Sequence, residues 1–401
     1  MSSAIRGAIV TLVRHVAVPL VASTLAACAA TQAPVGTGDL GVVVERASGT
    51  VAVVNTTDPR VLGEVAGLGD LSHASVVFSR DGLFAYVFGR DGALTKVNVL
   101  TRRIEVRVLQ AGNSIGGAIS QDGRYVAAQN YVPGGVKVFD AKTLQLVADV
   151  PAIVDGKPSR VVGLADLPGE RFVFSLFDAG QIWMIDLAAD PAHPKVTRFA
   201  NVGRQPYDGL VTPDGRHYVA GLFGEDGLAV LDLWDETPHV RKVLAGYGRG
   251  EAPLPVFKMP HLRGWAIAGR HAYLPAVGRH EVLVVDTETW EEVGRIAVAG
   301  QPVFVIARPD GRQVWVNFAV PDYDRVQVID TRSRRVVHTL EPGAAVLHME
   351  FTPRGEAVWI SSRDAHHVSV IDTERFTTLQ VLDLPSPSGV FFTARAARIG
   401  F

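Results

Sequence analysis

The chain has 401 residues, of which 47% are hydrophobic, and it contains 40 glycines, 23 prolines and one cysteine. Its formal net charge is −2, its pI is near 6.6 and no basic run stands out, which argues against nucleic acid or a bare anionic membrane surface as a partner. With a single cysteine, the chain cannot form an internal disulfide, a Cys-x-x-Cys-His attachment site for c-type haem or a thiolate-bound iron–sulfur cluster.

The N-terminus has the features of a lipoprotein signal peptide. Arg6 and Arg14 precede a short apolar stretch at residues 16–25, which is too short for a stable membrane span. The Leu-Ala-Ala-Cys sequence that follows resembles a bacterial lipobox and predicts that Cys28 is lipidated; an ordinary signal peptide with an incidental cysteine is the alternative. We therefore expect a signal peptide at 1–27, a flexible tether at 28–38 and a periplasmic protein held at the membrane only by its lipid.

From residue 39 to the C-terminus, the chain repeats an alternating apolar strand that ends in Asp or Asn. The pattern recurs at intervals of about 42 to 54 residues, and a period near 40 to 50 residues that is filled with strands is typical of propeller blades. A single blade cannot bury both of its faces, so it must stack on its neighbours. The eight terminal residues are Asn55, Asn98, Asp140, Asp186, Asp232, Asp286, Asp330 and Asp372.

A tight-turn sequence precedes most of these strands. Glycine takes the positive φ that such a turn requires, and in several units a proline presets the first turn position. Each unit therefore reads strand, turn, strand, loop, strand, turn, strand. The unit that ends at Asp286 is the longest, which predicts an insertion around residues 247–265. The turn glycines are Gly82, Gly123, Gly169, Gly215, Gly311 and Gly355.

These units predict an all-β fold, an eight-bladed β-propeller over residues 39–401, or seven blades if two units merge. The first unit lacks its own turn sequence, whereas a strand-like run at residues 389–394 follows the last unit. We expect this C-terminal strand to join the first blade, because that arrangement closes the ring and removes the open sheet edge.

Two short motifs have simple structural explanations. Residues 246–250 have the glycine spacing of a dinucleotide loop but do not join a strand to a helix, so we predict a surface loop and no NAD site. His366 and His367 could be metal ligands, but adjacent strand residues point to opposite faces and no third ligand is evident.

Two segments resemble the haem d1 propeller of the bacterial nitrite reductases. Residues 71–93, which include His73, are similar to the segment that carries the proximal iron-ligand histidine, and residues 346–355, which include His348, are similar to a segment with a distal-side histidine. The whole mature chain resembles the NirF family of haem d1 biosynthesis lipoproteins still more closely. The sequences that carry this second resemblance lie at residues 128–140, 205–209, 220–227, 254–265 and 386–395.

The chain departs from the nitrite reductases at two points. Ala307 stands where those enzymes have their other distal histidine, and the chain lacks their N-terminal cytochrome c domain. Nitrite reduction needs distal acids and a route for electrons. These departures favour a protein that handles the tetrapyrrole over one that reduces nitrite.

The resemblance implies a set of cofactor-binding residues, each with a simpler alternative. His73 would bind the haem iron, or else be a hydrogen-bonded loop residue. Arginine can hold the haem carboxylates in a bidentate manner, and we expect two or three of the candidates to do so while the others are solvated surface charges. Tyr131 and Trp265 would stack on or edge the macrocycle, or else belong to the core. The arginine candidates are Arg90, Arg160, Arg263 and Arg363.

Asp208, His348 and His261 are the candidate acids and bases. A dehydrogenation would need one of them within hydrogen-bond reach of the reacting side chain. Asp208 could instead stabilise a turn, and His348 could simply cap a blade.

We therefore expect the protein to bind a late haem d1 precursor, dihydro-haem d1, in the propeller channel. The resemblance implies a role around the oxidation of a propionate side chain to an acrylate, either as a dehydrogenase or, as we prefer, as a carrier. A carrier would present the precursor to other maturation proteins and to nitrite reductase. The alternatives are a propeller that acts only as a protein-interaction scaffold, and a lactonase-like enzyme, which would need clustered acidic metal ligands.

Overall fold

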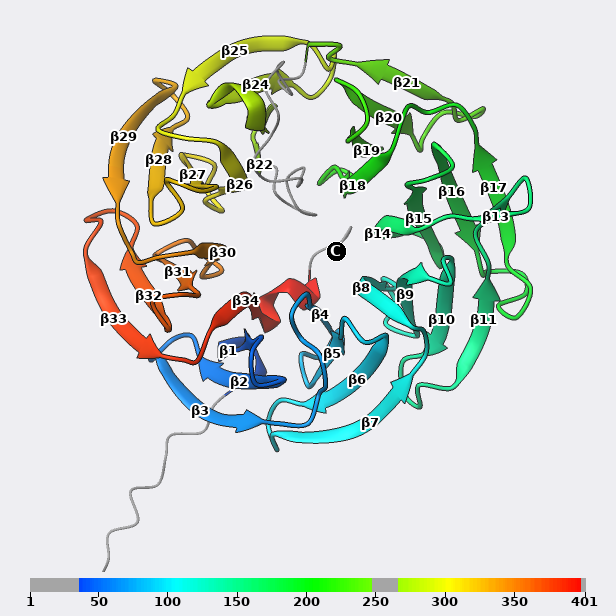
Figure 1. The fold of residues 1–401 in the computed structure, drawn as a ribbon, viewed down its shortest axis with the longest axis horizontal. Coiled ribbons are helices and arrows are strands. Elements are labelled where there is room, and N and C mark those ends of the chain that lie inside the picture. The colour runs from blue at the N-terminus through cyan, green and yellow to red at the C-terminus, as the bar shows by residue number, and fades with distance from the viewer. Residues whose placement is uncertain (1–35, 247–265, 398–401) are drawn as a thin grey trace, which may run out of the picture. The chain divides into compact units, whose positions relative to one another are not determined.

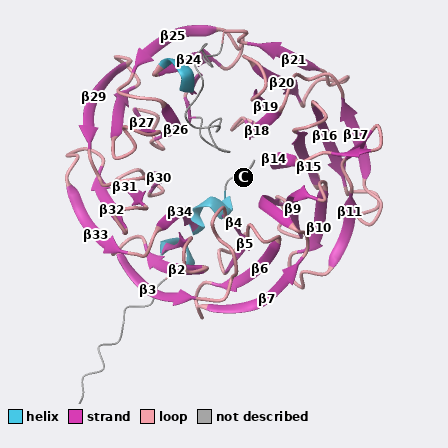
Figure 2. Cartoon of the chain, viewed as in Figure 1, coloured by secondary structure: helices cyan, strands magenta, loops and turns pink. Residues whose placement is uncertain are grey.

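The computed structural model describes residues 36–246 and 266–397, and this part of the chain is almost entirely β-structure. Its strands form eight four-stranded antiparallel sheets arranged in a ring, together with one two-stranded hairpin (Figures 1 and 2). The prediction of an eight-bladed propeller is confirmed, and the seven-bladed alternative is wrong. No helix in the described ranges is long and apolar enough to cross a membrane.

The blades are numbered here from the N-terminus, with the strands of each given from the channel outward. Blade 1 contains β34 (Pro387–Phe392), β1 (Leu40–Glu45), β2 (Thr50–Asn55) and β3 (Arg60–Val65); blade 2 contains β4 (Ser75–Phe78), β5 (Phe84–Phe88), β6 (Ala93–Asn98) and β7 (Arg103–Leu109); blade 3 contains β8 (Asn113–Ile119), β9 (Tyr125–Val132), β10 (Val136–Asp140) and β11 (Leu146–Val150); blade 4 contains β14 (Val161–Leu167), β15 (Arg171–Leu176), β16 (Gln181–Asp186) and β17 (Lys195–Phe199).

The second half of the ring follows the same order. Blade 5 contains β18 (Pro206–Val211), β19 (His217–Leu222), β20 (Leu228–Asp232) and β21 (Val240–Val243); blade 6 contains β22 (Ala266–Ala268), β23 (His271–Ala276), β24 (Glu281–Asp286) and β25 (Glu292–Ala297); blade 7 contains β26 (Pro302–Ala307), β27 (Gln313–Phe318), β28 (Val326–Asp330) and β29 (Arg335–Leu340); blade 8 contains β30 (Val346–Phe351), β31 (Ala357–Ser362), β32 (His367–Asp372) and β33 (Thr378–Asp383). The remaining elements are the hairpin β12 (Ile153–Val154) and β13 (Lys157–Pro158) and the short 3-10 turns η1 (Thr37–Asp39), η2 (Val277–Arg279) and η3 (Thr393–Ala397).

The hydrophobic core lies between neighbouring blades. Strand β1 is buried along its whole length, whereas the outer strand β7 alternates between exposed and half-buried residues, as expected for a sheet edge with one face in water. One cluster joins Trp359 of blade 8 to Val43 and Phe392 of blade 1. Each blade therefore buries its faces only by stacking on the next one.

The C-terminal strand closes the ring, as the sequence predicted. Strand β34 pairs antiparallel with β1, with Val42 opposite Phe391 and Gly41 opposite Phe392. Figure 1 shows this last strand, in red, beside the blue strands of the first blade. The first blade is thus made from both ends of the propeller sequence.

One face of the ring, called the turn face below, carries the repeated turns. The Gly82 and Gly311 turns have φ values of 69° and 72°, the left-handed region that glycine adopts without strain. The repeated Asp or Asn at the end of the third strand of each blade also has a local role. The Asp140 side chain, for example, accepts hydrogen bonds from the backbone N–H groups of Lys142 (3.0 Å) and Thr143 (2.8 Å), which fixes the turn into the outer strand.

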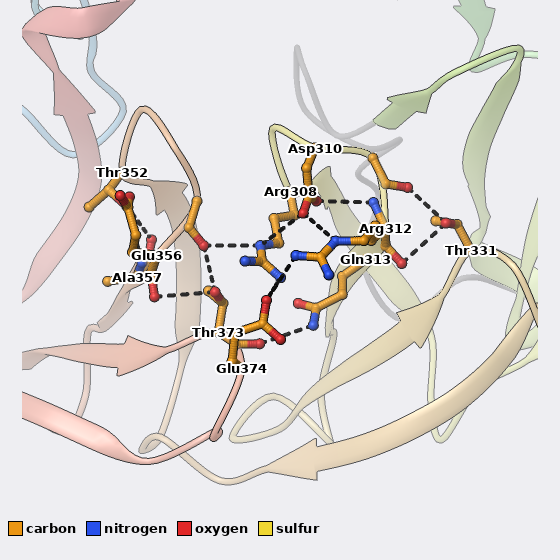
Figure 3. A network of polar contacts seen from close by, with 12 residues as sticks. Arg308, Asp310, Arg312, Gln313, Thr331, Thr352, Glu356, Ala357, Thr373 and Glu374 are labelled. Atoms are coloured by element: carbon orange, nitrogen blue, oxygen red, sulfur yellow. Dashed lines mark hydrogen bonds and ion pairs between the residues drawn. The ribbon is translucent and has the colours of Figure 1, made fainter.

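Ion pairs tie adjacent blades together on the turn face, as Figure 3 shows for blades 7 and 8. Arg308 donates to the carbonyl oxygen of Gly355 (3.1 Å) and pairs with Glu374 (2.6 Å). Arg312 pairs with the same Glu374 (2.9 Å), so one carboxylate of blade 8 holds two arginines of blade 7.

The opposite face, called the loop face below, carries the links between the second and third strands of each blade and the links from blade to blade. These segments differ in length and sequence, and they include the extra hairpin β12–β13. The predicted insertion at 247–265, with His261, Arg263 and Trp265, lies outside the described residues, as does Cys28.

Candidate functional site

A cavity of about 370 Å³ lies in the channel on the loop-face side. Four residues singled out from the sequence line it together: His73, Asp208, His348 and Arg363. They come from blades 2, 5 and 8, so only the closed ring brings them to one place. The rest of the wall is largely apolar, with Phe304 and Phe391 among the lining residues.

His73 lies in the loop between β3 and β4 and is half-buried. Its loop is held on both sides. The Arg46 guanidinium donates to the carbonyl oxygen of Ser72, and the Asp70 carboxylate accepts from the Ser72 N–H (2.8 Å). The backbone N–H of Arg90 donates to the Asp70 carbonyl oxygen (2.7 Å). The loop is therefore fixed where His73 meets the cavity, which suits an imidazole that must hold a metal in one position.

His348 lies on the inner strand β30, with its ring between two phenylalanines. Its ring centroid is 5.1 Å from that of Phe304 and 5.2 Å from that of Phe391. The backbone N–H of Val390 in β34 points at Nδ1 of His348, at 3.1 Å. Because an N–H can only donate, Nδ1 must be the unprotonated nitrogen, and the proton of the neutral ring lies on Nε2. In this state His348 offers a hydrogen-bond donor at Nε2 and no lone pair for a metal.

Three arginines line the cavity on the side of blades 8 and 1: Arg46, Arg363 and Arg395. Arg363 is held by Asp364 through two parallel contacts, from Nε to Oδ1 (2.6 Å) and from Nη2 to Oδ2 (2.9 Å). Burial and the nearby Arg363 charge lower the pKa of Arg46. Guanidinium groups gathered in this way favour an anion between them, and a planar carboxylate matches their geometry.

On the side of blades 3 to 5, Tyr207 is the aromatic residue that lines the cavity within the described part of the chain. Its ring centroid lies 5.7 Å from that of Phe177 and 5.8 Å from that of Phe223, and its hydroxyl lies 3.3 Å from that of Tyr131. Burial raises the pKa of both tyrosines, which keeps them protonated as neutral donors. Tyr131 itself stands one layer behind Tyr207.

Asp208 follows Tyr207 in strand β18 and is buried. It lies within the strand rather than in a turn, so the simpler explanation offered for it, that it stabilises a turn, is wrong. Among the residues that the structure describes, Asp208 is the acidic residue that lines the same cavity as His73 and His348.

Two of the predicted arginines do not line the cavity. Arg160 is bound by Asp178, with Nη2 2.5 Å from Oδ1, and lies over the ring of Phe177 at 4.2 Å, with 43% of its side chain exposed. Arg90 is half-buried behind the His73 loop, where its backbone bonds to Asp70. Both stand at the rim of the loop face.

Sequence reasoning missed Arg46, Arg395 and Phe304. Arg46 follows the second strand of its blade directly, as Arg363 does in blade 8, so an alignment of blades would have found it. Phe304 comes from the segment aligned with the second distal histidine. The aligned residue, Ala307, lines a different cavity nearer the turn face, whereas Phe304 packs on His348.

The histidine pair at 366–367 has structural roles. The His367 ring nitrogens lie near the carbonyl oxygens of Ala365 (3.1 Å) and Pro342 (2.7 Å), and His366 accepts from the Ser386 N–H (3.2 Å). Within residues 36–246 and 266–397, no group of three or more His, Cys, Asp or Glu side chains is placed to hold a metal ion.

Comparison with known proteins agrees with this arrangement. Residues 35–396 match the family described as the cytochrome D1 heme domain. Protein NirF of Pseudomonas aeruginosa is 58% identical over 385 residues, covering 95% of this chain and 98% of the relative, and Protein NirF of Stutzerimonas stutzeri is 57% identical, covering 94% and 96%.

A solved structure, described as dihydro-heme d1 dehydrogenase NirN in complex with DHE, has a similar fold. Its TM-score is 0.78 at 24% identity, with 91% of this chain and 78% of that chain covered. At this identity the likeness concerns the fold. The family match and the high identity over nearly the full length have a direct consequence: the chain belongs to the cytochrome d1 haem domain family and, within it, to the NirF family.

Proposed function

We propose that this protein serves haem d1 biosynthesis by binding a late precursor, dihydro-haem d1, in the loop-face cavity. The observation that carries the proposal is the convergence on one cavity of an imidazole, a donor imidazole and three arginines, namely His73, His348, Arg46, Arg363 and Arg395. The solved NirN structure, a relative on the same fold, is described in complex with DHE and as a dihydro-heme d1 dehydrogenase.

The donor set fits a haem with carboxylate side chains. His73 would be the iron ligand, because the Nδ1 contact with Val390 leaves His348 as a hydrogen-bond donor only. Arg46 and Arg363 would hold carboxylates, while Phe304 and Phe391 would cover apolar parts of the ring. When bound, the tetrapyrrole would supply the redox-active iron.

Within this proposal, Asp208 is the proton acceptor of the described cavity. His348 cannot accept a proton at Nε2 while Nδ1 receives the Val390 N–H, so its role is to donate a hydrogen bond. His261 stays a candidate base that lies outside the described residues. Oxidation of a propionate to an acrylate side chain removes two electrons and two protons, and the electrons would have to pass to an external acceptor.

We prefer a carrier, which presents the precursor to other maturation proteins and to nitrite reductase, over a dehydrogenase. The test of binding is direct. The purified protein, without its first 27 residues, is mixed with ferric d1-type haem and its absorption spectrum is recorded. A shift of the Soret and long-wavelength bands is expected at micromolar protein, and an unchanged spectrum would leave a propeller that acts only as an interaction scaffold.

A second measurement separates the carrier from the catalyst. A carrier should bind dihydro-haem d1 and leave it unchanged until a partner protein is added. A dehydrogenase should oxidise it repeatedly with an artificial electron acceptor, and Asp208→Asn should slow that turnover without weakening binding. Multiple turnover by the isolated protein would overturn our preference.

We also propose that the protein is a periplasmic lipoprotein anchored through Cys28. The lipobox-like sequence supports this proposal. The substitution Cys28→Ser should move the protein from the membrane fraction to the soluble periplasmic fraction. If the substituted protein stays in the membrane fraction, the anchor is not a lipid on this residue.

A further inference from the structure

A buried ion pair lies in the channel beside the ligand cavity. Glu350 of β30 is 2% exposed and Arg395 of η3 is 6% exposed. Arg395 Nε lies 2.8 Å from Oε1 of Glu350, and its Nη2 contacts the second carboxylate oxygen. Glu350 is two residues beyond His348 on the same strand, so the two side chains leave β30 on the same side.

Blades 1 to 3 hold η3 on both sides of Arg395 in the sequence. The hydroxyl of Thr393 donates to the carbonyl oxygen of Leu40 (2.8 Å), and Arg80 donates from Nη1 to the carbonyl oxygen of Ala396 (2.8 Å). Arg80 also donates to the carbonyl oxygens of Ile119 (3.1 Å) and Ser120 (2.9 Å). The turn η3 therefore lies along one side of the channel, against the neighbouring blades 8, 1, 2 and 3, and Figure 1 shows it, in red, beside β34 and β4.

The two partners of the buried pair face different cavities. Arg395 lines the loop-face cavity, together with His73 and His348. Glu350 lines a second cavity of about 460 Å³, with Ala268 and Ala307, which lies toward the turn face. The Arg395–Glu350 ion pair therefore lies between the two cavities and separates them at this point.

We infer that η3 forms the floor of the ligand cavity on the side of blades 8, 1 and 2, where the Arg395–Glu350 pair and the Arg80 contact hold it. There the floor separates the ligand cavity from the second cavity and limits how deeply a ligand can sit, with Arg395 as the positioning residue. This inference goes beyond the proposed function, because it is a property of the protein before any ligand binds.

The first test uses the protein without ligand. The single natural cysteine is replaced by Cys28→Ser, and Ala396→Cys is introduced on η3, where Ala396 is 8% exposed. Labelling by N-ethylmaleimide should be many times slower than that of an exposed control, Thr101→Cys. Adding Glu350→Gln should speed labelling at position 396, whereas Glu356→Gln, an exposed acid of the same blade, should not. Equal labelling rates at positions 396 and 101 would contradict the inference that η3 forms the floor.

The second test asks whether the floor limits ligand exchange. A chain that ends at Thr393 keeps β34 and the Thr393 contacts but loses Arg395 and Ala396. Ferric d1-type haem should dissociate several times faster from this chain than from the full chain, and the unfolding temperature reports separately on any loss of stability. Equal dissociation rates would contradict the floor, whereas a full chain that binds no haem would refute the proposed function and leave the labelling test to decide the floor.

Discussion

The turn face and the loop face of the propeller use the repeated sequence in opposite ways. On the turn face, equivalent residues do the same work in blade after blade: a glycine at positive φ closes the first hairpin, and an Asp or Asn side chain accepts from backbone N–H groups of the turn into the outer strand. On the loop face, Arg46 and Arg363 share one place in their units, but other residues that line the cavity have no such equivalents. His73 and Asp208 each occur in one blade only at their place in the unit.

This difference separates residues that maintain the fold from residues that bind. A turn-face residue acts within its own hairpin or on the next blade, so its replacement changes stability. A loop-face residue faces a cavity shared by blades from both ends of the chain, so its replacement should change ligand binding and leave stability nearly intact. Four substitutions or conditions test that separation, beginning with the largest expected effect.

The substitution His73→Ala should remove the proposed iron ligand of bound haem d1. The low-spin bands of the complex should disappear or shift, while the arginine contacts still hold the ligand more weakly. Absorption spectroscopy of the ferric complex and the unfolding temperature without ligand are the two readouts. His193→Ala, at an exposed site on the outside of blade 4, is the control. Identical spectra for the His73 variant and the parent would remove His73 from the iron.

The substitution Arg46→Gln should weaken binding of the carboxylate-bearing ligand about 10- to 100-fold, since a hydrogen bond to a charged group contributes about 1.5 to 3 kcal/mol. Titration followed by absorbance gives the dissociation constant. Arg103→Gln, on the exposed outer strand β7, should bind like the parent. A dissociation constant unchanged by Arg46→Gln would show that the arginine side of the cavity does not face the carboxylates.

The substitution Gly311→Ala tests the turn face. Gly311 has a φ of 72°, and a Cβ there would meet only ordinary contacts, the nearest being Ala268 Cβ at 3.7 Å. The cost is therefore conformational and should be about 1 kcal/mol of unfolding free energy. Denaturant unfolding measures it, and haem affinity should stay unchanged. A loss of affinity without a loss of stability would break the separation between the faces.

Acid should destabilise the turns of the turn face. Hydrogen bonds from Arg270 and from the Thr289 backbone lower the pKa of Asp286 from 3.8 to about 2, and turn contacts also lower the pKa of Asp330 and Asp372. A carboxyl group whose pKa is lower in the folded state stabilises the fold above its unfolded pKa, and this stabilisation is lost as the pH falls through the folded value. The unfolding temperature should therefore fall between about pH 4 and pH 2.

The matched variant for the acid experiment is Asp286→Asn, which keeps the turn geometry but does not titrate. Its unfolding temperature should depend less steeply on pH in that range than that of the parent. The same pH dependence in both proteins would place the acid sensitivity elsewhere in the molecule.

The sequence was sufficient for the fold because the signals of the turn face are local. The Gly82 turn and the Asx turn at Asp140 depend on residues within a few positions, and repetition fixes the number of blades. The cavity is not local. Arg46 and Arg395 reach it from the two ends of the propeller, and Arg160 is drawn to the rim by Asp178, a partner in a neighbouring loop that no spacing in the sequence reveals.

Because β34 and η3 are the last elements of the chain, the ligand cavity is completed only after the C-terminal residues have been made. The residues that fix the His348 ring, through the Val390 N–H, and that supply the floor, through Arg395, are among the last to be made. A chain that is still unfinished, or that has lost β34 to a protease, has its earlier histidine and arginine loops but no complete pocket. Chains without β34 should therefore not capture a scarce cofactor precursor, and an affinity tag is better attached away from the C-terminus.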